Sequence, residues 1–229
     1  LDGHELERCD QIRDLGVLLD VKLTFAHHID NTMAKANKML GLLMRSMQMT
    51  CRPRGRNFDS RAVMCAFNAH VRSVLQYASV IWSGAAVSHL ARLERLQHRF
   101  LMWLAANTRA NCPSLEYVSL LQHFNTTSIR TRFVHSDLMF LYNVLNHRID
   151  CADLVAMFGL AVPGRRSRHT GLMHEPFARV NVVKSSIFTR VPRSCNLLFQ
   201  HVPAADIFHR TSFRRDVWAY ARTLSPYNS

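Results

Sequence analysis

The sequence lacks any run of apolar residues that reaches the roughly 18 to 20 needed to cross a bilayer. Its first ten residues, LDGHELERCD, have neither the basic start nor the apolar stretch of a secretory signal peptide. Its six cysteines include no C-x-x-C pair, which argues against a disulfide framework and against a zinc finger. We therefore expect an intracellular protein with reduced cysteines and no membrane partner.

Acidic residues and lysine are also scarce. The chain has 16 acidic residues against 29 basic ones, which gives a formal net charge of +13, and only four of the basic residues are lysine. The planar fork of arginine pairs with phosphate through two hydrogen bonds and stacks on bases, so this balance suits a nucleic-acid surface. A merely soluble basic surface, or a coding bias toward arginine, explains the same composition.

The chain contains enough hydrophobic residues to form a core. It has 229 residues, of which 48% are hydrophobic. A chain of this size can form one or two folded domains, and extensive disorder is not expected.

Near the N-terminus the pattern predicts a short β-hairpin. We expect one strand near Glu5 to Arg8 and a second from Ile12 to Leu19, which is apolar enough to be covered on both faces. Asp14 and Asp20 bracket the second strand, and a strand of that length would hold them some 20 Å apart, too far for a shared metal ion. Gly16 marks a position where a side chain would clash, or where backbone or nucleic acid approaches closely.

Three helices should follow and pack as a small bundle with short connections. The first has its apolar residues between Ile29 and Met47, the second runs from Ser60, an expected N-cap, to Trp82, and the third from Ser88 to about Ala106. The inward faces of the second and third helices are expected to hold Val63, Phe67, Val71, Val74, Ala78 and Ile81, and Leu90, Leu93, Leu96, Phe100, Trp103 and Leu104.

Pro113 marks a break, and the region beyond it is expected to be mostly helical. Ile129 to Leu145 predicts a long helix and Ala152 to Phe158 a short one. Between residues 161 and 191 the helical period is lost, which predicts a basic loop followed by extended segments. Helical pattern returns weakly at 194–200 and more clearly at 212–223. The predicted fold is thus mainly α, with an N-terminal hairpin, a helical bundle and a mostly helical C-terminal region containing a loop or extended segment.

Clustered arginines are the candidate nucleic-acid contacts. Arginine-dense loops can reach phosphates without a fixed register, and a helical stripe of arginine can do the same, although a solvated helix face has the same pattern. Phe177 and Phe188 could stack on bases, but aromatic residues at such spacings are more often core. The candidate residues are Arg52, Arg54 and Arg56 in one loop, Arg165, Arg166 and Arg168 in another, and Arg92, Arg95 and Arg99 on the third helix.

Catalytic and metal-binding patterns are weak. Ser194 and Cys195 have no base or orienting acid at any local spacing, so no catalytic residue is assigned. The four histidines considered as metal ligands are not spaced for a tetrahedral site, so no metal site and no cofactor are assigned. These histidines are His27, His28, His169 and His174.

Four segments in order resemble one polymerase family. DLGVLLDVKLTFAHHI at 14–29, KANKMLGLLMRSM at 35–47, HVRSVLQYASVIWS at 70–83 and RLERLQHRFLMWL at 92–104 resemble the palm end and thumb of reverse transcriptases from non-LTR retrotransposons, particularly jockey-like elements. Segments 138–155, 185–208 and 212–220 resemble the region after the thumb in those polymerases, so the likeness covers nearly the whole chain.

The resemblance implies an organisation and a role. Residues 1–25 would be the palm-edge hairpin, 26–107 the thumb bundle and 113–229 the post-thumb region. The thumb would hold the backbone of an RNA–DNA hybrid, with the upstream palm and fingers of the same polyprotein as the other partner. The parent element would act in the nucleus and cytoplasm.

The chain departs from the family in one respect that decides its chemistry. The family's metal-binding aspartates lie in a Tyr-x-Asp-Asp turn upstream, and this sequence contains no Asp-Asp pair. Two-metal phosphoryl transfer needs such carboxylates. We therefore expect a noncatalytic C-terminal fragment, with Mg²⁺ bound only in the intact polymerase. The alternatives are a stand-alone, element-derived nucleic-acid-binding or interaction protein, and a decayed copy with no selected role.

Overall fold

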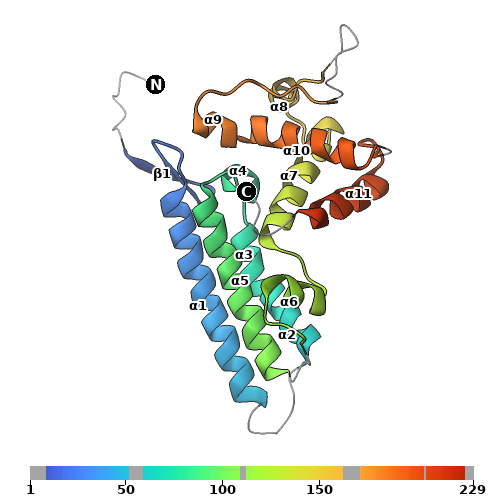
Figure 1. The fold of residues 1–229 in the computed structure, drawn as a ribbon. Helices are drawn as coiled ribbons and strands as arrows, with labels where there is room; N and C mark the ends of the chain where they lie inside the picture. The colour runs from blue at the N-terminus through green and yellow to red at the C-terminus, as the bar shows by residue number, and fades with distance from the viewer. Residues whose placement is uncertain (1–8, 52–58, 109–111, 162–170, 204, 225–229) are drawn as a thin grey trace.

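The computed structural model describes residues 9–51, 59–108, 112–161, 171–203 and 205–224. It is mainly helical, with a two-stranded antiparallel hairpin ahead of the helices (Figure 1). The predicted fold class is therefore confirmed. None of the described helices is both long and apolar enough to cross a membrane.

The hairpin consists of β1 (Gln11–Asp14) and β2 (Val17–Asp20). The predicted single strand from Ile12 to Leu19 is wrong, because this run folds back on itself through Leu15 and Gly16. Both turn residues have positive φ, 43° and 89°, as a tight two-residue hairpin turn requires, and glycine adopts such values without strain. All four residues of β1 are exposed, so the expectation of cover on both faces is also wrong.

The turn places Asp14 and Asp20 on two different strands. Asp14 pairs with Val17, and Asp20 pairs with Gln11, so the carboxylates do not lie at opposite ends of one long strand. Asp20 instead accepts hydrogen bonds from the Thr24 amide and hydroxyl and from the Phe25 amide, at 2.9–3.0 Å. Desolvation acts to raise the pKa of Asp20, but these hydrogen bonds outweigh it and leave the pKa below its ordinary value.

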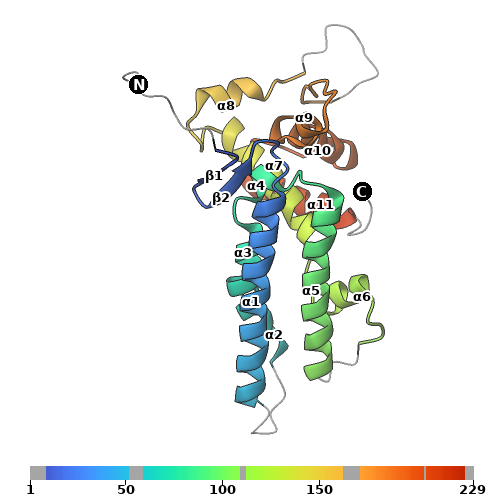
Figure 2. The ribbon, with the colours of Figure 1, turned by 90° about the vertical axis from the view of Figure 1, so that its left-hand side faces the viewer.

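Helices α1 (Ala26–Cys51) and α5 (Val87–Asn107) are the longest in the described chain. They lie side by side and run in the same direction (Figures 1 and 2). The three-and-four spacing of their apolar residues places one face of each in the core, as predicted. On α1 the fully enclosed residues are Ile29, Ala36 and Leu40.

The predicted second helix is divided into four pieces. It contains α2 (Ser60–Phe67), the π-helical turn η2 (Asn68–Arg72), α3 (Ser73–Gln76) and α4 (Ser79–Trp82). The N-cap is Asp59, whose carboxylate accepts the Arg61 N–H at 2.9 Å, so the assignment of Ser60 was off by one residue. Ala78, with φ of 50°, separates α3 from α4.

The π turn shifts the buried face by one residue. The predicted inward residues Val63, Phe67 and Val71 are buried, and Arg72 beside them is buried as well. A π turn holds one residue more than an α turn, so the face that follows it is displaced. After the turn the enclosed residues are Leu75, Ser79 and Trp82, whereas Val74, Ala78 and Ile81 had been expected.

The C-terminal half differs from expectation in two places. Between residues 112 and 128 the structure has a helix, α6, that the sequence pattern had not indicated. Extended segments had been expected before 191, but α9 and the first turn of α10 occupy this stretch. The helices here are α6 (Tyr117–His123), α7 (Ile129–Leu145), α8 (Ala152–Met157), α9 (Asn181–Ser185), α10 (Ile187–His201) and α11 (Arg210–Thr223).

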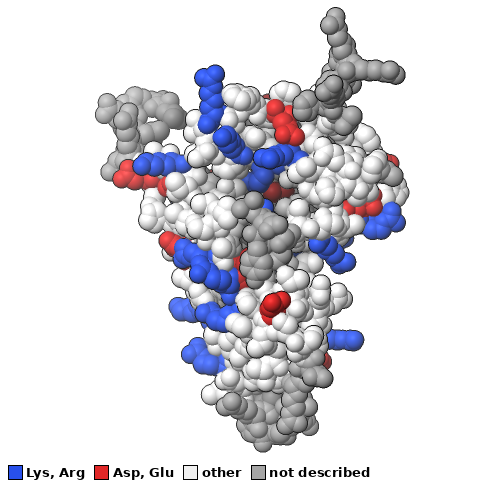
Figure 3. Space-filling model, in the orientation of Figure 1, with Lys and Arg blue, Asp and Glu red and all other residues white. Residues whose placement is uncertain are grey.

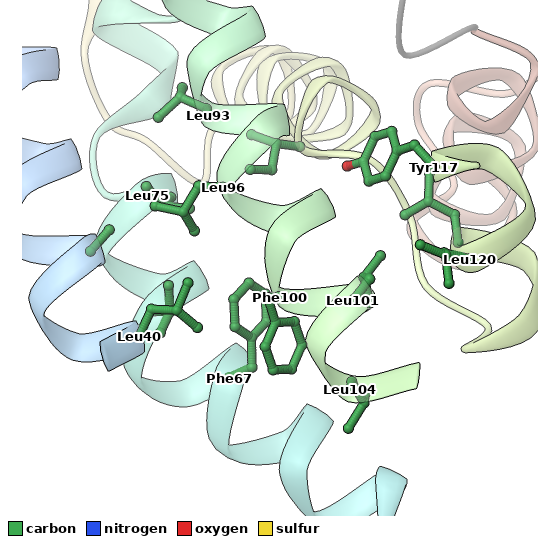
Figure 4. Packing of buried hydrophobic residues seen from close by; sticks show 14 of the residues in the cluster. Leu40, Phe67, Leu75, Leu93, Leu96, Phe100, Leu101, Leu104, Tyr117 and Leu120 are labelled. Carbon is green, nitrogen blue, oxygen red and sulfur yellow. The ribbon is translucent and has the colours of Figure 1, made fainter. Parts of the chain in front are cut away.

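Two apolar cores lie along the chain, and α7 contributes to both. The first core joins α1, α2–α4, α5 and α6 with the start of α7, and its centre includes the Phe67 and Phe100 rings, stacked 3.9 Å apart (Figure 4). The second core joins the rest of α7 with α10 and α11. We use the name stem for α1 to α5 and the name C-terminal lobe for residues 134–224.

The stem and the lobe meet at a buried ion pair. Arg190 on α10 donates from Nε and Nη2 to the Asp137 carboxylate on α7, at 2.8 and 3.2 Å. The same guanidinium donates to the carbonyls of Ser185 and Val80, at 2.7 and 2.8 Å. Because Val80 belongs to α4, this one side chain connects the lobe to the stem.

Candidate nucleic-acid interface

Two arginines of the predicted stripe on α5 connect it to α1. Arg92 Nη1 lies 2.6 Å from Asp30 Oδ1, and Arg99 Nη2 donates to Asn37 Oδ1. The two contacts are seven residues apart on both helices, which fits their parallel alignment. Exposed ion pairs contribute little to stability, so these contacts orient the arginines more than they hold the helices together.

The exposed charged residues of α1 and α5 are all basic except Asp30. We name the outward surface of these two helices the α1–α5 face. Only two carboxylates belong to these helices: Asp30 is paired with Arg92, and Glu94 is buried. Figure 3 shows lysine and arginine side chains along this side of the stem. The basic residues of the face are Lys35, Lys38, Arg45, Arg92, Arg95 and Arg99, all exposed except the half-buried Arg92.

A groove at the hairpin end of the stem extends the basic surface. It has a volume of about 740 Å³ and lies between the hairpin, α1 and α3. Arg13 and Lys35 line it together with Tyr77, whose side chain is largely exposed and whose hydroxyl donates to the Leu15 carbonyl at 2.7 Å. Sequence reasoning missed this groove, because its walls come together only after the chain turns at Gly16.

His28 in the same groove is a structural residue. Its Nδ1 accepts the Leu18 N–H at 3.3 Å and so attaches α1 to β2. Burial, and secondly the charge of Lys35, lower the pKa of His28 below its ordinary 6.5. A histidine shifted in this direction is neutral at pH 7, so the positive charge of the groove comes from Arg13 and Lys35.

Beneath the α1–α5 face, α5 carries a buried polar network that the sequence analysis had not predicted. Glu94 accepts hydrogen bonds from the Tyr117 hydroxyl and from the Ile129 and Arg130 amides, and so caps the N-terminus of α7. Burial raises its pKa, although these hydrogen bonds oppose the shift. The network fixes α6 and α7 against α5.

Gln97 continues this network one turn farther along α5. Its Nε2 donates to the Tyr117 hydroxyl at 3.0 Å, and its Oε1 accepts from Arg72 Nη2 at 3.2 Å. Arg72 also donates to the Thr126 hydroxyl at 2.8 Å. Burial, followed by the charge of Arg132, lowers the pKa of Arg72 to about 9.

The other candidate arginines belong to two segments without a described position. Arg52, Arg54 and Arg56 lie outside the residues that the structure describes, and so do Arg165, Arg166 and Arg168. Their assignment to nucleic-acid contact remains a prediction from the sequence.

The two candidate stacking residues have different environments. Phe188 packs into the second core, with its ring 5.3 Å from that of Phe158. Phe177 is 86% exposed, and the Arg179 guanidinium lies 5.9 Å from its ring centre. Of the two, only Phe177 has a ring face available to a ligand.

The described residues contain no group of three histidine, cysteine or acidic side chains placed to hold a metal ion. His169 lies outside them. Cys195, beside Ser194, is buried, and burial raises the pKa of its thiol to about 12. A thiol with that pKa is not a thiolate nucleophile at neutral pH.

Comparisons of the chain with protein-family models, with curated proteins and with solved structures gave no match.

Proposed function

We propose that this chain is the C-terminal, thumb-containing part of a non-LTR retrotransposon reverse transcriptase, and that its stem binds the backbone of an RNA–DNA hybrid. The observation that supports the proposal is the one-sided charge of the α1–α5 face. Six basic side chains gather on two parallel helices, and the only carboxylate exposed there is already paired with Arg92.

The dimensions of the face suit a duplex. Helix α1 has 26 residues, which corresponds to about 39 Å at 1.5 Å per residue and is close to one turn of a nucleic-acid helix. Each phosphate that a basic side chain neutralises releases counterions and adds affinity that does not depend on sequence. Such contacts hold a duplex in position without reading bases.

The groove beside the hairpin extends this surface toward the end of the stem where the upstream palm would attach. Arg13 and Lys35 supply charge there, and Tyr77 supplies an exposed ring. In this proposal the stem orients the primer–template, and positioning of this kind can account for a large share of a polymerase's rate. The metal-binding carboxylates and Mg²⁺ would belong to the upstream palm of the same polyprotein.

Hybrid binding tests the proposal directly. We expect Lys35→Ala/Lys38→Ala/Arg45→Ala to weaken binding of a labelled RNA–DNA hybrid, because fewer phosphates are neutralised. The slope of log K against log salt should fall by up to about 0.9 for each phosphate that is no longer neutralised. The readout is fluorescence anisotropy of the labelled hybrid over a series of salt concentrations.

The matched control is Arg193→Ala/Arg210→Ala/Arg214→Ala, which removes the same charge from exposed positions on α10 and α11. Equal weakening by the two triple variants would mean that net charge alone drives binding, and the proposed interface would be abandoned. A selective effect of the α1 variant supports it.

Primer extension tests the noncatalytic part of the proposal. We expect the chain alone to add no nucleotide to a primed RNA template with Mg²⁺ or Mn²⁺, because it contains no adjacent pair of aspartates. Measurable nucleotide incorporation by the purified chain would refute this assignment.

A further inference from the structure

A second basic site lies on the side of α5 that faces α6 and α7, away from the contacts between α5 and α1. It is a cleft of about 440 Å³ between α5, α6 and the start of α7. This volume lies in the range of about 300 to 1,000 Å³ that is usual for small-molecule sites. The cleft is lined by Val87, Ser88, Leu90, Ala91, Glu94, Arg95, His98, Tyr117 and Arg130.

The two arginines of the cleft have no direct partner in the parts of the chain that the structure describes. Neither Arg95 nor Arg130 makes a side-chain hydrogen bond or ion pair there. His98 lies beside them, with Nε2 3.0 Å from the Leu115 carbonyl, so this nitrogen carries the proton. Two free guanidinium groups on different helices therefore line the same cleft.

Glu94 also lines the cleft, but its oxygens are already engaged. Its carboxylate forms part of the inner wall, and both oxygens already accept hydrogen bonds, from the Tyr117 hydroxyl and from the first two amides of α7. A carboxylate held by three donors is committed to the fold. The side chains that remain available to a ligand in the cleft are the two arginines and the apolar wall.

We propose that this cleft binds a nucleotide, with its phosphate between Arg95 and Arg130 and its base against the apolar wall. The guanidinium fork matches phosphate geometry and forms strong, charge-assisted hydrogen bonds. Val87, Leu90 and Ala91 provide an apolar surface next to these forks, which suits the face of a base. A free nucleoside monophosphate and one nucleotide of a single strand share this chemistry.

The inference does not depend on hybrid binding by the stem, because it uses a different surface. Arg95 is the only residue of the cleft that also belongs to the α1–α5 face. Loss of one site therefore leaves the other to be measured separately.

Calorimetric titration of the full chain with AMP, with inorganic phosphate and with a ten-nucleotide oligo(dA) tests the proposal. Arg95→Ala and Arg130→Ala should each weaken AMP binding about tenfold or more, because each removes charge-assisted hydrogen bonds to phosphate. Neither side chain forms a hydrogen bond or ion pair in the described structure, so neither substitution is expected to unfold the protein. Circular dichroism melting curves check this.

The control is Arg193→Ala, which removes the same charge from the exposed surface of α10 and should leave AMP binding unchanged. AMP binding at least as tight as that of oligo(dA) identifies the free nucleotide as the ligand. Tighter binding of oligo(dA), with the same sensitivity to Arg95 and Arg130, identifies a single strand. Equal binding of phosphate and AMP, or no effect of either arginine variant, would overturn the proposal.

Discussion

Arg72 in the stem and Arg190 in the lobe are both largely removed from water, but their partners differ. Arg72 is held by neutral acceptors, the Gln97 amide and the Thr126 hydroxyl, and burial lowers its pKa to about 9. Arg190 meets the Asp137 carboxylate and two main-chain carbonyls. The stem therefore hydrogen-bonds its buried arginine to uncharged groups, whereas the lobe pairs its arginine with a buried carboxylate.

Removal of the lobe's buried cation should have the largest effect. Arg190→Ala leaves Asp137, only 3% exposed, without its partner, and uncompensated buried charges of this kind cost about 3–5 kcal/mol. Urea unfolding of the full chain measures the change. Arg193→Ala, an exposed position on the same helix, is the control and should change stability by less than about 0.5 kcal/mol. If both variants are equally stable, the ion pair does not hold the lobe to the stem.

A side chain added at Gly84 should also disrupt the contact between stem and lobe. A Cβ on Gly84 would lie 2.0 Å from the Ser185 carbonyl oxygen and 2.5 Å from Arg190 Nη1, so Gly84→Ala should destabilise by about 1–3 kcal/mol. Gly41→Ala makes the same change inside α1, where nothing lies within 4 Å, and should stabilise by about 0.5–1 kcal/mol. Opposite signs in thermal melts are expected. Equal shifts would show that the close approach at Gly84 is absent.

The lobe should also respond to mild acid. His135 on α7 stacks on Trp218 of α11 at 4.1 Å, and burial, followed by the charges of Arg214 and Arg132, lowers its pKa from 6.5 to about 4. As the pH falls, the unfolded chain binds a proton at His135 before the folded chain does. The contribution of the neutral ring to the free energy of unfolding is therefore fully present above pH 6.5 and is lost as the pH falls toward 4. We expect a loss of about 1–2 kcal/mol, a discounted figure because the ring is only partly buried.

His135→Phe keeps the stacked ring and removes the titration. Urea unfolding at pH 7 and pH 5 should therefore show a smaller difference for this variant than for the wild type. The same difference in both proteins would exclude His135 as the group responsible.

The smallest expected effects concern the two arginine-rich segments, at residues 52–56 and 165–168. Arg52→Ala/Arg54→Ala/Arg56→Ala should weaken hybrid binding equally for all sequences and reduce the salt slope by up to about 0.9 for each phosphate released from its arginine. Arg165→Ala/Arg166→Ala/Arg168→Ala makes the matched comparison in the segment before α9. An unchanged salt slope would remove the corresponding segment from the interface.

The local spacing of apolar residues predicted the long helices but not the hairpin turn or the π turn. Helices α1, α5 and α7 follow from apolar residues at three-and-four spacing, which needs no knowledge of distant partners. The hairpin turn at Gly16 was missed because the surrounding apolar residues read as one continuous strand. Helix α6 is short, and its burial depends on contact with α5.

The site was predicted less completely than the fold, for a similar reason. The arginines of α5 were found because basic residues at regular spacing are visible in the sequence. The groove with Arg13 and Tyr77 and the cleft with Arg130 join residues far apart in the chain, so they depend on tertiary packing. Buried Glu94 gave no signal, because a glutamate among arginines reads as a solvated helix face.

The π turn at Asn68–Arg72 carries a consequence for changes in chain length. Each residue of an α-helix turns the chain by about 100°, so deletion of one residue from this turn would rotate everything that follows relative to α2. Leu75 and Trp82 would then leave the first core, and the Val80 carbonyl would no longer face Arg190. Substitutions at the exposed residues Asn68, Ala69 and His70 should be tolerated, but a frame-preserving loss of a single codon should not.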